Sequence, residues 1–255
     1  MSHSSQALMA HHVRLHLGGY FSEDIEICPG WRFASSAVVP DIYWNYAYST
    51  SGASMTPEVE ESIRTHASRI SRSPAWWHPS EPGDHADSLE AWMMLRDLDA
   101  LREAQTTTSP WRLATSSVAN DDVLSVFGDA YGPEGSPDDA GYFELPPAYI
   151  DALRDTVPEG GVRVAHTVAY HDGEPVGIAS VYQEAEGFAG LYNVGVSHGF
   201  RRRGVGSAVS ASAVARALDT GATEVILQTP ASSPVESLYR ALGFERVFCG
   251  VLAAL

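Results

Sequence analysis

Three consecutive arginines stand directly before a Gly-x-Gly pair, and this stretch is the one best suited to chemistry on a charged ligand. Residues 201–207 read Arg-Arg-Arg-Gly-Val-Gly-Ser. A helix that begins at such glycines presents unpaired backbone amides and a partial positive charge. Glycine has no Cβ, so the backbone can approach a bulky ligand closely. The stretch therefore predicts a site for a polyanionic group such as a pyrophosphate.

The rest of the chain is acidic, which makes this cluster stand out. The 255 residues include 32 Asp and Glu against 16 basic residues, and every basic residue is Arg, so the net charge is −16. This charge argues against nucleic acid and against anionic membranes as partners, because both need a broad cationic surface. A chain without Lys also cannot form the Lys-containing phosphate loop of P-loop NTPases.

The elements around the arginines have the order that an anion site at a helix start requires. A strand is predicted over 189–196 and a helix over 204–220, whose apolar residues recur at spacings of three and four. Ser233, Pro234 and Glu236 form the pattern of a capping box that opens another helix. The other elements predicted in this half are strands 111–118, 162–170, 175–182, 224–229 and 245–255, and helices 121–130, 147–156 and 233–242.

The first half has weaker patterns. Its polar stretch 104–110 is predicted to link a domain over 1–106 to a second domain over 107–255. The order of strand, helix, strand and helix matches that of 189–242, so the first half is either a diverged copy or an unrelated domain. The elements predicted there are strands 25–35, 41–47 and 74–78, and helices 56–71 and 88–98.

The second half resembles the GNAT acyltransferase superfamily. Residues 201–206 fit its Arg/Gln-x-x-Gly-x-Gly/Ala motif, and residues 238–244 (Leu-Tyr-Arg-Ala-Leu-Gly-Phe) are similar to its Leu-Tyr-x-x-Leu-Gly-Phe segment. A helix and a strand are predicted between the two motifs, as in that fold. The resemblance covers about 110–255 and implies an α/β (α+β) GNAT fold, in which helices flank a mixed sheet with splayed parallel strands. If the first half is a degenerate copy, the chain is a tandem of GNAT-like halves.

The resemblance also implies a co-substrate, acetyl-CoA or another acyl-CoA, and roles for individual residues. The backbone of Val194 and Val196 is expected to pair with the pantetheine arm, and Tyr239 to act as general acid toward the leaving thiolate. Ser232 departs from the family, since many members have Asn there. The implied cofactor-binding residues are Val194, Gly195, Val196, Arg201, Arg202, Arg203, Gly204, Val205, Gly206, Ser207 and Ser232.

The acceptor is expected to be a small-molecule amine, and a cationic one, because the acidic surface attracts cations. Tyr192 and Asn193 are the predicted substrate residues. The general base stays open between a water chain from these two residues and the carboxylates of Glu144, Glu184 and Glu186. The aromatic runs 43–46 and 76–77 either form the wall of an acceptor pocket or belong to the core or a domain interface.

Two other functions fit the same residues. An acyl carrier protein could replace CoA as donor by docking on the arginines, or the fold could bind CoA for regulation without catalysis. A metal site is not expected, because the ten histidines lack ligand spacing and the two cysteines do not form a ligand pair. The N-terminal sequence lacks the pattern of a secretory signal, so a cytoplasmic location is predicted.

Overall fold

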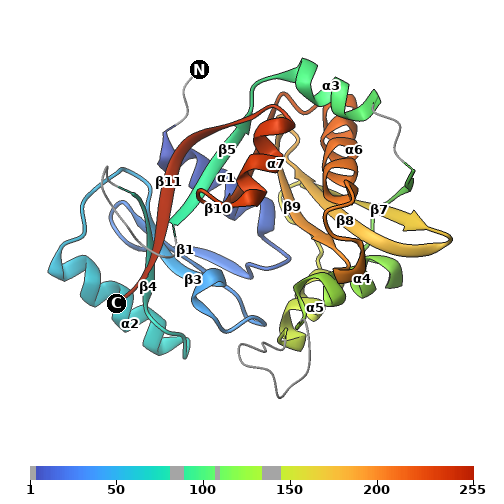
Figure 1. Cartoon of the computed structure of the whole chain (residues 1–255). Coiled ribbons are helices and arrows are strands. Elements are labelled where there is room, and N and C mark those ends of the chain that lie inside the picture. The colour runs from blue at the N-terminus through green and yellow to red at the C-terminus, as the bar shows by residue number, and fades with distance from the viewer. Residues whose placement is uncertain (1–3, 81–88, 107–109, 134–144) are drawn as a thin grey trace.

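A single mixed β-sheet runs through the computed structural model, which describes residues 4–80, 89–106, 110–133 and 145–255. Within these residues the sheet has eleven strands in the order β1-β2-β3-β4-β11-β5-β10-β9-β8-β7-β6 (Figure 1). The strands are β1 (Glu23–Cys28), β2 (Trp31–Ser35), β3 (Asn45–Ser49), β4 (Ala75–Pro79), β5 (Leu89–Leu95), β6 (Arg112–Ser116), β7 (Arg163–His171), β8 (Glu174–Gln183), β9 (Phe188–Val196), β10 (Glu224–Pro230) and β11 (Phe244–Ala254). The helices are α1 (Ser5–His16), α2 (Pro57–Arg69), α3 (Leu98–Thr106), α4 (Asp121–Tyr131), α5 (Pro147–Arg154), α6 (Val205–Asp219) and α7 (Pro234–Ala241), with 3-10 turns η1 (Ile42–Trp44) and η2 (His198–Phe200).

The second half builds its part of the sheet from an antiparallel run followed by a parallel crossover. Strands β6 to β9 pair antiparallel in sequence order. The chain then passes through α6 and returns as β10, which is parallel to β9. Helix α7 follows and lies beside α6 in Figure 1. The predicted elements of this half are thereby confirmed, with shifts of a few residues at their ends.

The first half repeats this arrangement on a smaller scale. Strands β1, β2 and β3 are antiparallel, α2 crosses over, and β4 returns parallel to β3. This sequence of connections is the same as that of β7, β8, β9, α6 and β10. The diverged-duplication alternative therefore agrees with the observed topology.

The two halves exchange a strand. Strand β5 of the first half lies between β10 and β11 and is antiparallel to both (Figure 1). Strand β11 of the second half in turn lies between β5 and β4. The sheet therefore crosses the predicted boundary between 106 and 107 in both directions, and that boundary stays a prediction.

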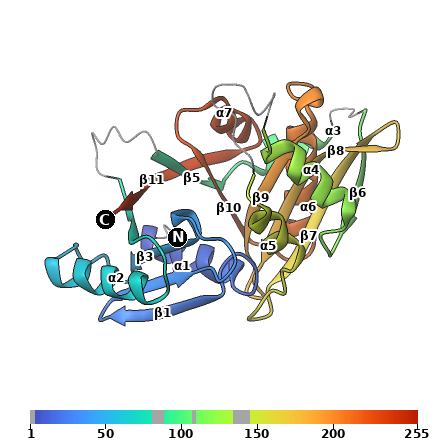
Figure 2. The ribbon, with the colours of Figure 1, turned by 90° about the horizontal axis from the view of Figure 1, so that it is seen from below.

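Two layers of apolar side chains pack on opposite faces of the central strands. Because side chains alternate along a strand, Val225 and Leu227 of β10 point toward α6, whereas Ile226 points toward α1. The α6 side consists mainly of aliphatic side chains. The α1 side is rich in aromatic rings, including Trp77 and Trp92. Figure 2 shows α1 and α2 with the strands of the first half and α4, α5 and α6 with those of the second.

The helix predicted over 88–98 is wrong: residues 89–95 form β5, and α3 begins only at Leu98. Both faces of β5 are covered, with Met93 toward α6 and Trp92 toward α1, so the strand reads as an apolar run rather than an alternation. Helix α3 also occupies 104–106 of the predicted linker 104–110, of which 107–109 lie outside the described residues.

Three further differences concern the N-terminal region. The strand predicted over 25–35 is a hairpin, because Gly30 adopts φ +78° and turns the chain between β1 and β2. The predicted strand 41–47 begins as the 3-10 turn η1. Helix α1 was not predicted, because two of its buried positions are His12 and His16, which break the apolar periodicity.

Candidate active site

Strands β9 and β10 separate after a short parallel ladder and form a wedge. They pair only from Glu224 to Ile226 on β10, opposite 188–190 on β9, although both strands continue beyond this point. The β8–β9 register shifts at Asn193, whose φ is +50°. A bulge of this kind bends a strand and re-aims its backbone. The edge of β9 over 191–196 therefore faces an opening rather than a partner strand.

The alternation of hydrogen bonds shows which amides face this opening. The amide of Ser197 donates to the carbonyl of Val176 at 3.0 Å, so residue 197 belongs to a hydrogen-bonded pair with β8. In an antiparallel ladder each adjacent residue of the same strand turns its amide and carbonyl away from the partner strand. Val196 is such a residue, and its amide is directed into the wedge.

The arginine-glycine loop lies at the mouth of the wedge and opens α6. Gly204 is the N-cap residue with φ +82°, a left-handed conformation that glycine adopts without strain. No side chain caps this helix, so the amides of its first turn keep no capping partner. Gly206 and Ser207 line the adjacent cavity, which places this helix start where an anion can reach it.

The three arginines of the loop have different surroundings. The guanidinium of Arg201 donates to the carbonyl of Ala130 at 2.9 Å and to that of Val196 at 3.3 Å, so it ties the loop to α4 and β9. Arg202 is exposed and left-handed, with φ +58°. Arg203 is exposed and lies over the ring of Phe200 at 5.3 Å. All three arginines are exposed, and Arg201 and Arg202 line the adjacent cavity, so these two lie nearest to a ligand in it.

A cavity of about 690 Å³ joins the loop to the wedge and to α7. Tyr239 of α7 lines it and is only 5% exposed. Burial raises the pKa of Tyr239, so its phenol keeps the proton at neutral pH. Tyr131, at the end of α4, enters the same cavity and donates a hydrogen bond of 3.0 Å to the carbonyl of Val194. No local pattern in the sequence distinguishes Tyr131.

Helix α7, which carries Tyr239, is fixed by the predicted capping box. Ser233 Oγ accepts from the amide of Glu236 at 3.2 Å, and the Glu236 carboxylate accepts from the amide of Ser232 at 2.6 Å. Glu236 is 2% exposed and is also bound by Arg246 and Arg240. The Ser232 amide is thus used within the protein, and Ser232 is not among the described residues that line the cavity.

Tyr192 and Asn193, whose role as substrate residues stays a prediction, lie on β9 at the wedge, and each has partners in the protein. The Tyr192 hydroxyl hydrogen bonds with Nδ1 of His12 at 3.1 Å. The Asn193 amide donates to Ser180 Oγ at 3.4 Å and accepts from the Tyr20 hydroxyl at 3.5 Å. The ring of Tyr192 also contacts His12 and His16 in the aromatic layer under α1.

Two of the three carboxylates considered as general base, Glu184 and Glu186, do not line the cavity at the wedge. Glu184 precedes the start of β9, roughly 20 Å of strand away from Val194. Burial of Glu184 acts to raise its pKa, but the hydrogen bond from His11 and the contact with Arg14 outweigh burial and lower it. Glu186 lines the same hollow as Glu184. Glu144 lies outside the described residues.

A carboxylate that the sequence did not suggest lies on the other face of the wedge. Glu90 of β5 lines a cavity of about 110 Å³ together with Trp77, Trp92 and three aromatic residues of 43–46. The aromatic runs 43–46 and 76–77 therefore contribute both to the core and to a pocket wall. The sequence did not indicate Glu90, because a helix predicted over 88–98 cannot pair with β10 as the strand β5 does.

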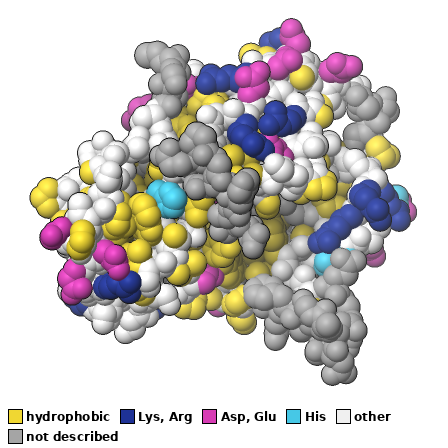
Figure 3. All heavy atoms as spheres, turned by 60° about the vertical axis from the view of Figure 1, so that its left-hand side comes forward, with side chains coloured by type: hydrophobic (Ala, Val, Ile, Leu, Met, Phe, Trp, Pro, Cys, Tyr) yellow, Lys and Arg dark blue, Asp and Glu magenta, His cyan; other side chains and the backbone are white. Residues whose placement is uncertain are grey.

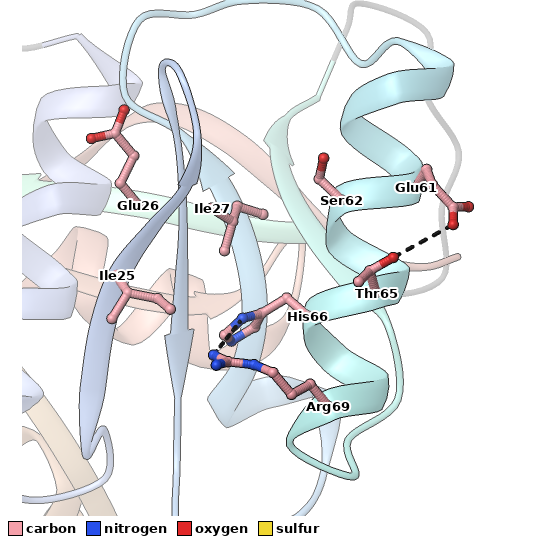
Figure 4. A pocket seen from close by; sticks show the side chains of 8 residues that line it. All are labelled: Ile25, Glu26, Ile27, Glu61, Ser62, Thr65, His66 and Arg69. Carbon is pink, nitrogen blue, oxygen red and sulfur yellow. Dashed lines mark hydrogen bonds between the residues drawn. The ribbon is translucent and has the colours of Figure 1, made fainter.

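Two observations concern the rest of the molecule. A separate hollow lies between β1 and α2 and is lined by Glu26, Glu61 and His66 among others (Figure 4). It shares no lining residue with the cavity at the wedge. On the face in Figure 3, positive side chains form small separate groups. Among the described residues, no cluster of three His, Cys, Asp or Glu is placed to hold a metal, and no helix is long and apolar enough to cross a membrane.

Comparisons with known proteins agree with this geometry. The sequence model of the Acetyltransferase (GNAT) family matches residues 129–244, so this part of the chain is similar to a GNAT acetyltransferase domain. No curated protein matches the chain. A GCN5-related N-acetyltransferase from Kribbella flavida is 19% identical with a TM-score of 0.65, covering 99% of this chain and 95% of that one.

A second solved structure is a tandem GNAT protein from the clavulanic acid biosynthesis pathway. It is 16% identical with a TM-score of 0.60, and the match covers 88% of this chain and 78% of that one. A conserved protein of unknown function from Staphylococcus epidermidis is 15% identical with a TM-score of 0.60, covering 91% and 94%. The predicted GNAT fold is confirmed, and the tandem neighbour is consistent with two GNAT-like halves.

Proposed function

We propose that the GNAT domain over 129–244 transfers an acetyl or other acyl group from acyl-CoA to the amine of a small molecule. One observation carries the proposal: the open edge of β9, the uncapped start of α6 and the phenol of Tyr239 all border one cavity. Each of these features suits a different part of an acyl-CoA. Together they match the order pyrophosphate, pantetheine and thioester along a single ligand.

Different groups of the protein bind different parts of acyl-CoA. The amides at 205–207, with Arg202 and Arg203 nearby, hold the pyrophosphate. The backbone of Val194 and Val196 pairs with the pantetheine amides, and the Val196 amide stabilises the oxyanion that develops on the thioester oxygen. The protein thus contributes mainly positioning and a fixed donor.

The transfer step needs two proton movements. The amine nitrogen attacks the thioester carbon and forms the C–N bond, and the C–S bond then breaks. Tyr239 gives its phenolic proton to the leaving thiolate, which a buried phenol with a raised pKa can do because it is protonated before the step. The nitrogen loses its own proton to a base.

The first half does not carry a second acyl-CoA site in this proposal. The segment 50–56 before α2 contains no arginine. The amide of Val59 is bound by the Thr56 hydroxyl at 3.4 Å, and Glu58 and Glu60 lie in the first turn. Negative charge at a helix start repels an anionic ligand from it.

A CoA-release assay tests the proposal with acetyl-CoA and a panel of small amines. Tyr239→Phe is expected to lower kcat by about 100-fold, as for loss of a general acid, and to leave the KM for acetyl-CoA within about twofold. Tyr170→Phe is the matched control, since its hydroxyl binds Asp122 at the start of α4 and neither residue lines the cavity.

An unchanged kcat for Tyr239→Phe would remove that residue from its role. Absence of both CoA release and calorimetric CoA binding would overturn the proposal as a whole. CoA binding without turnover would favour a regulatory module. Turnover with acyl carrier protein and none with acyl-CoA would replace the donor.

A further inference from the structure

The cavity that contains Glu90 lies beside the wedge, on the sheet face opposite α6. Register places it there: Glu90 pairs with Pro230 and Trp92 pairs with Gln228, both on β10 beyond the last residue that pairs with β9. Gln228 lies on the same face as Ile226, which packs toward α1. Neighbouring strands are about 4.8 Å apart, so Glu90 is one strand spacing from the edge of the wedge.

Aromatic rings surround the Glu90 carboxylate. Trp77 and Trp92 meet edge to face with centroids 5.3 Å apart, and Trp44 closes another side. His12 lies between the two sides of the wedge, with its ring 5.7 Å from that of Trp92 and its Nδ1 on the Tyr192 hydroxyl. Tyr192 thereby links β9 to the wall of this cavity.

The Glu90 carboxylate has no hydrogen bond or ion pair with any residue that the structure describes. Burial raises the pKa of Glu90 to about 7. The titratable groups that face it are His12 from α1, Tyr43 from η1 and Tyr46 from β3. Burial lowers the pKa of His12, which is therefore neutral, and it raises that of Tyr46, so the described lining offers no positive charge to Glu90. Glu90 is half-buried, and a carboxylate that is partly withdrawn from water without a partner gains from a cation beside it.

We propose that this cavity binds the ammonium group of the acceptor against Glu90 and the aromatic rings, and that Glu90 accepts the proton which the ammonium must lose before its nitrogen attacks the thioester. The proposal rests on the proposed function, since it names the acceptor class and the base of that reaction. Aromatic faces attract cations within about 6 Å, and a carboxylate adds the opposite charge. The volume of about 110 Å³ fits a small primary or secondary amine.

The proton balance of the step is complete with this residue. The bound ammonium first gives one proton to a Glu90 oxygen, which frees the lone pair of the nitrogen. The neutral amine then forms the C–N bond and loses its second proton to water, while the C–S bond breaks and the Tyr239 proton passes to the thiolate. Glu90 returns its proton to water and Tyr239 regains one after the products leave. The two groups lie on opposite faces of the wedge, so the acceptor and the thioester enter from different sides.

Binding of butylammonium to the whole chain, without any CoA, tests the site separately from catalysis. A titration followed through the indole N–H signals in two-dimensional NMR should shift those of Trp77 and Trp92, and butanol should shift them less. Glu90→Gln should weaken butylammonium binding at least tenfold and leave butanol binding unchanged. Glu61→Gln, in the hollow of Figure 4, is the matched control and should have no effect.

The pH dependence gives a second readout. Butylammonium binding to the natural chain should strengthen as pH rises through about 7, because Glu90 ionises, and Glu90→Gln should lose this dependence. Equal binding by the natural chain and Glu90→Gln, or no binding by either, would overturn the site even if CoA release with amines is normal. Binding of butylammonium with no CoA release would instead support the site and contradict acyl transfer.

Discussion

Replacement of Glu236 by Gln tests the network that holds α7, and therefore Tyr239, in place. The carboxylate is 2% exposed and receives hydrogen bonds from Arg246, from Arg240 at 2.7 Å and from the Ser232 amide at 2.6 Å. The bond from Arg246 contributes most to lowering the pKa of Glu236 to about 2, and burial partly opposes it.

The size of the expected effect follows from this pKa. An unfolded Glu titrates near 4.3, so the shift corresponds to about 3 kcal/mol at neutral pH. The folded pKa is the lower one, which means that the stabilisation is complete above about pH 5 and is lost as pH falls toward 2. At pH 3 about 1.4 kcal/mol should remain. Glu236→Gln should therefore reduce the free energy of unfolding by about 2–3 kcal/mol at pH 7, and by about half as much at pH 3.

Urea denaturation at both pH values measures this difference. Glu60→Gln is the matched control, because Glu60 pairs with Arg64 at 2.7 Å on α2 with both side chains at least 40% exposed. Exposed pairs contribute little, so this control should change the free energy of unfolding by less than about 0.5 kcal/mol. A loss for Glu236→Gln that is the same at pH 7 and pH 3 would show that packing, and not the charge network, holds α7.

Two further substitutions test the cofactor side of the wedge. Tyr131→Phe removes the hydroxyl that donates to the Val194 carbonyl, a hydrogen bond of about 1 kcal/mol that the pantetheine arm must replace. Calorimetry should therefore show that Tyr131→Phe binds CoA up to about fivefold more tightly, and weaker binding would show that Tyr131 contacts the ligand instead. Gly177→Ala would place a Cβ 2.3 Å from a methyl of Val205 at the start of α6. The clash should lower the free energy of unfolding in urea by about 1–3 kcal/mol and raise the KM for acetyl-CoA. An unchanged KM would argue against this loop as the phosphate site.

The second half was predictable because its signals are local. Gly204 marks the start of α6 through its backbone freedom, and Ser233 and Glu236 mark the start of α7 through a capping pattern read over four residues. Hydrogen bonds within a few residues of each other determine both features. The position of Tyr239 on the cavity then follows from where the two helices begin.

The proposed acceptor site was not predictable, because it depends on which strands become neighbours. Glu90 reaches the wedge only because β5 pairs with β10, and no local pattern at 89–95 encodes that pairing. Strands covered on both faces lack the alternation that would distinguish them from a buried helix. The role of Arg201 was hidden for a similar reason, since its partner carbonyl at Ala130 lies far away in the sequence.

The exchanged strands give the first half a structural role beside the GNAT domain. Strand β5 fills the space between β10 and β11, and a chain separated at 106 would leave those two strands without the partner that satisfies their backbone groups. The same strand brings Glu90 to the wedge, and α1 brings His12 to Tyr192. If the acceptor binds as proposed, the halves have divided one active site: the second holds the cofactor and the thiolate acid, and the first supplies the base and most of the aromatic wall. Loss of an anion-binding loop from the first half then costs the enzyme nothing, whereas loss of β5 would remove both a central strand and the base.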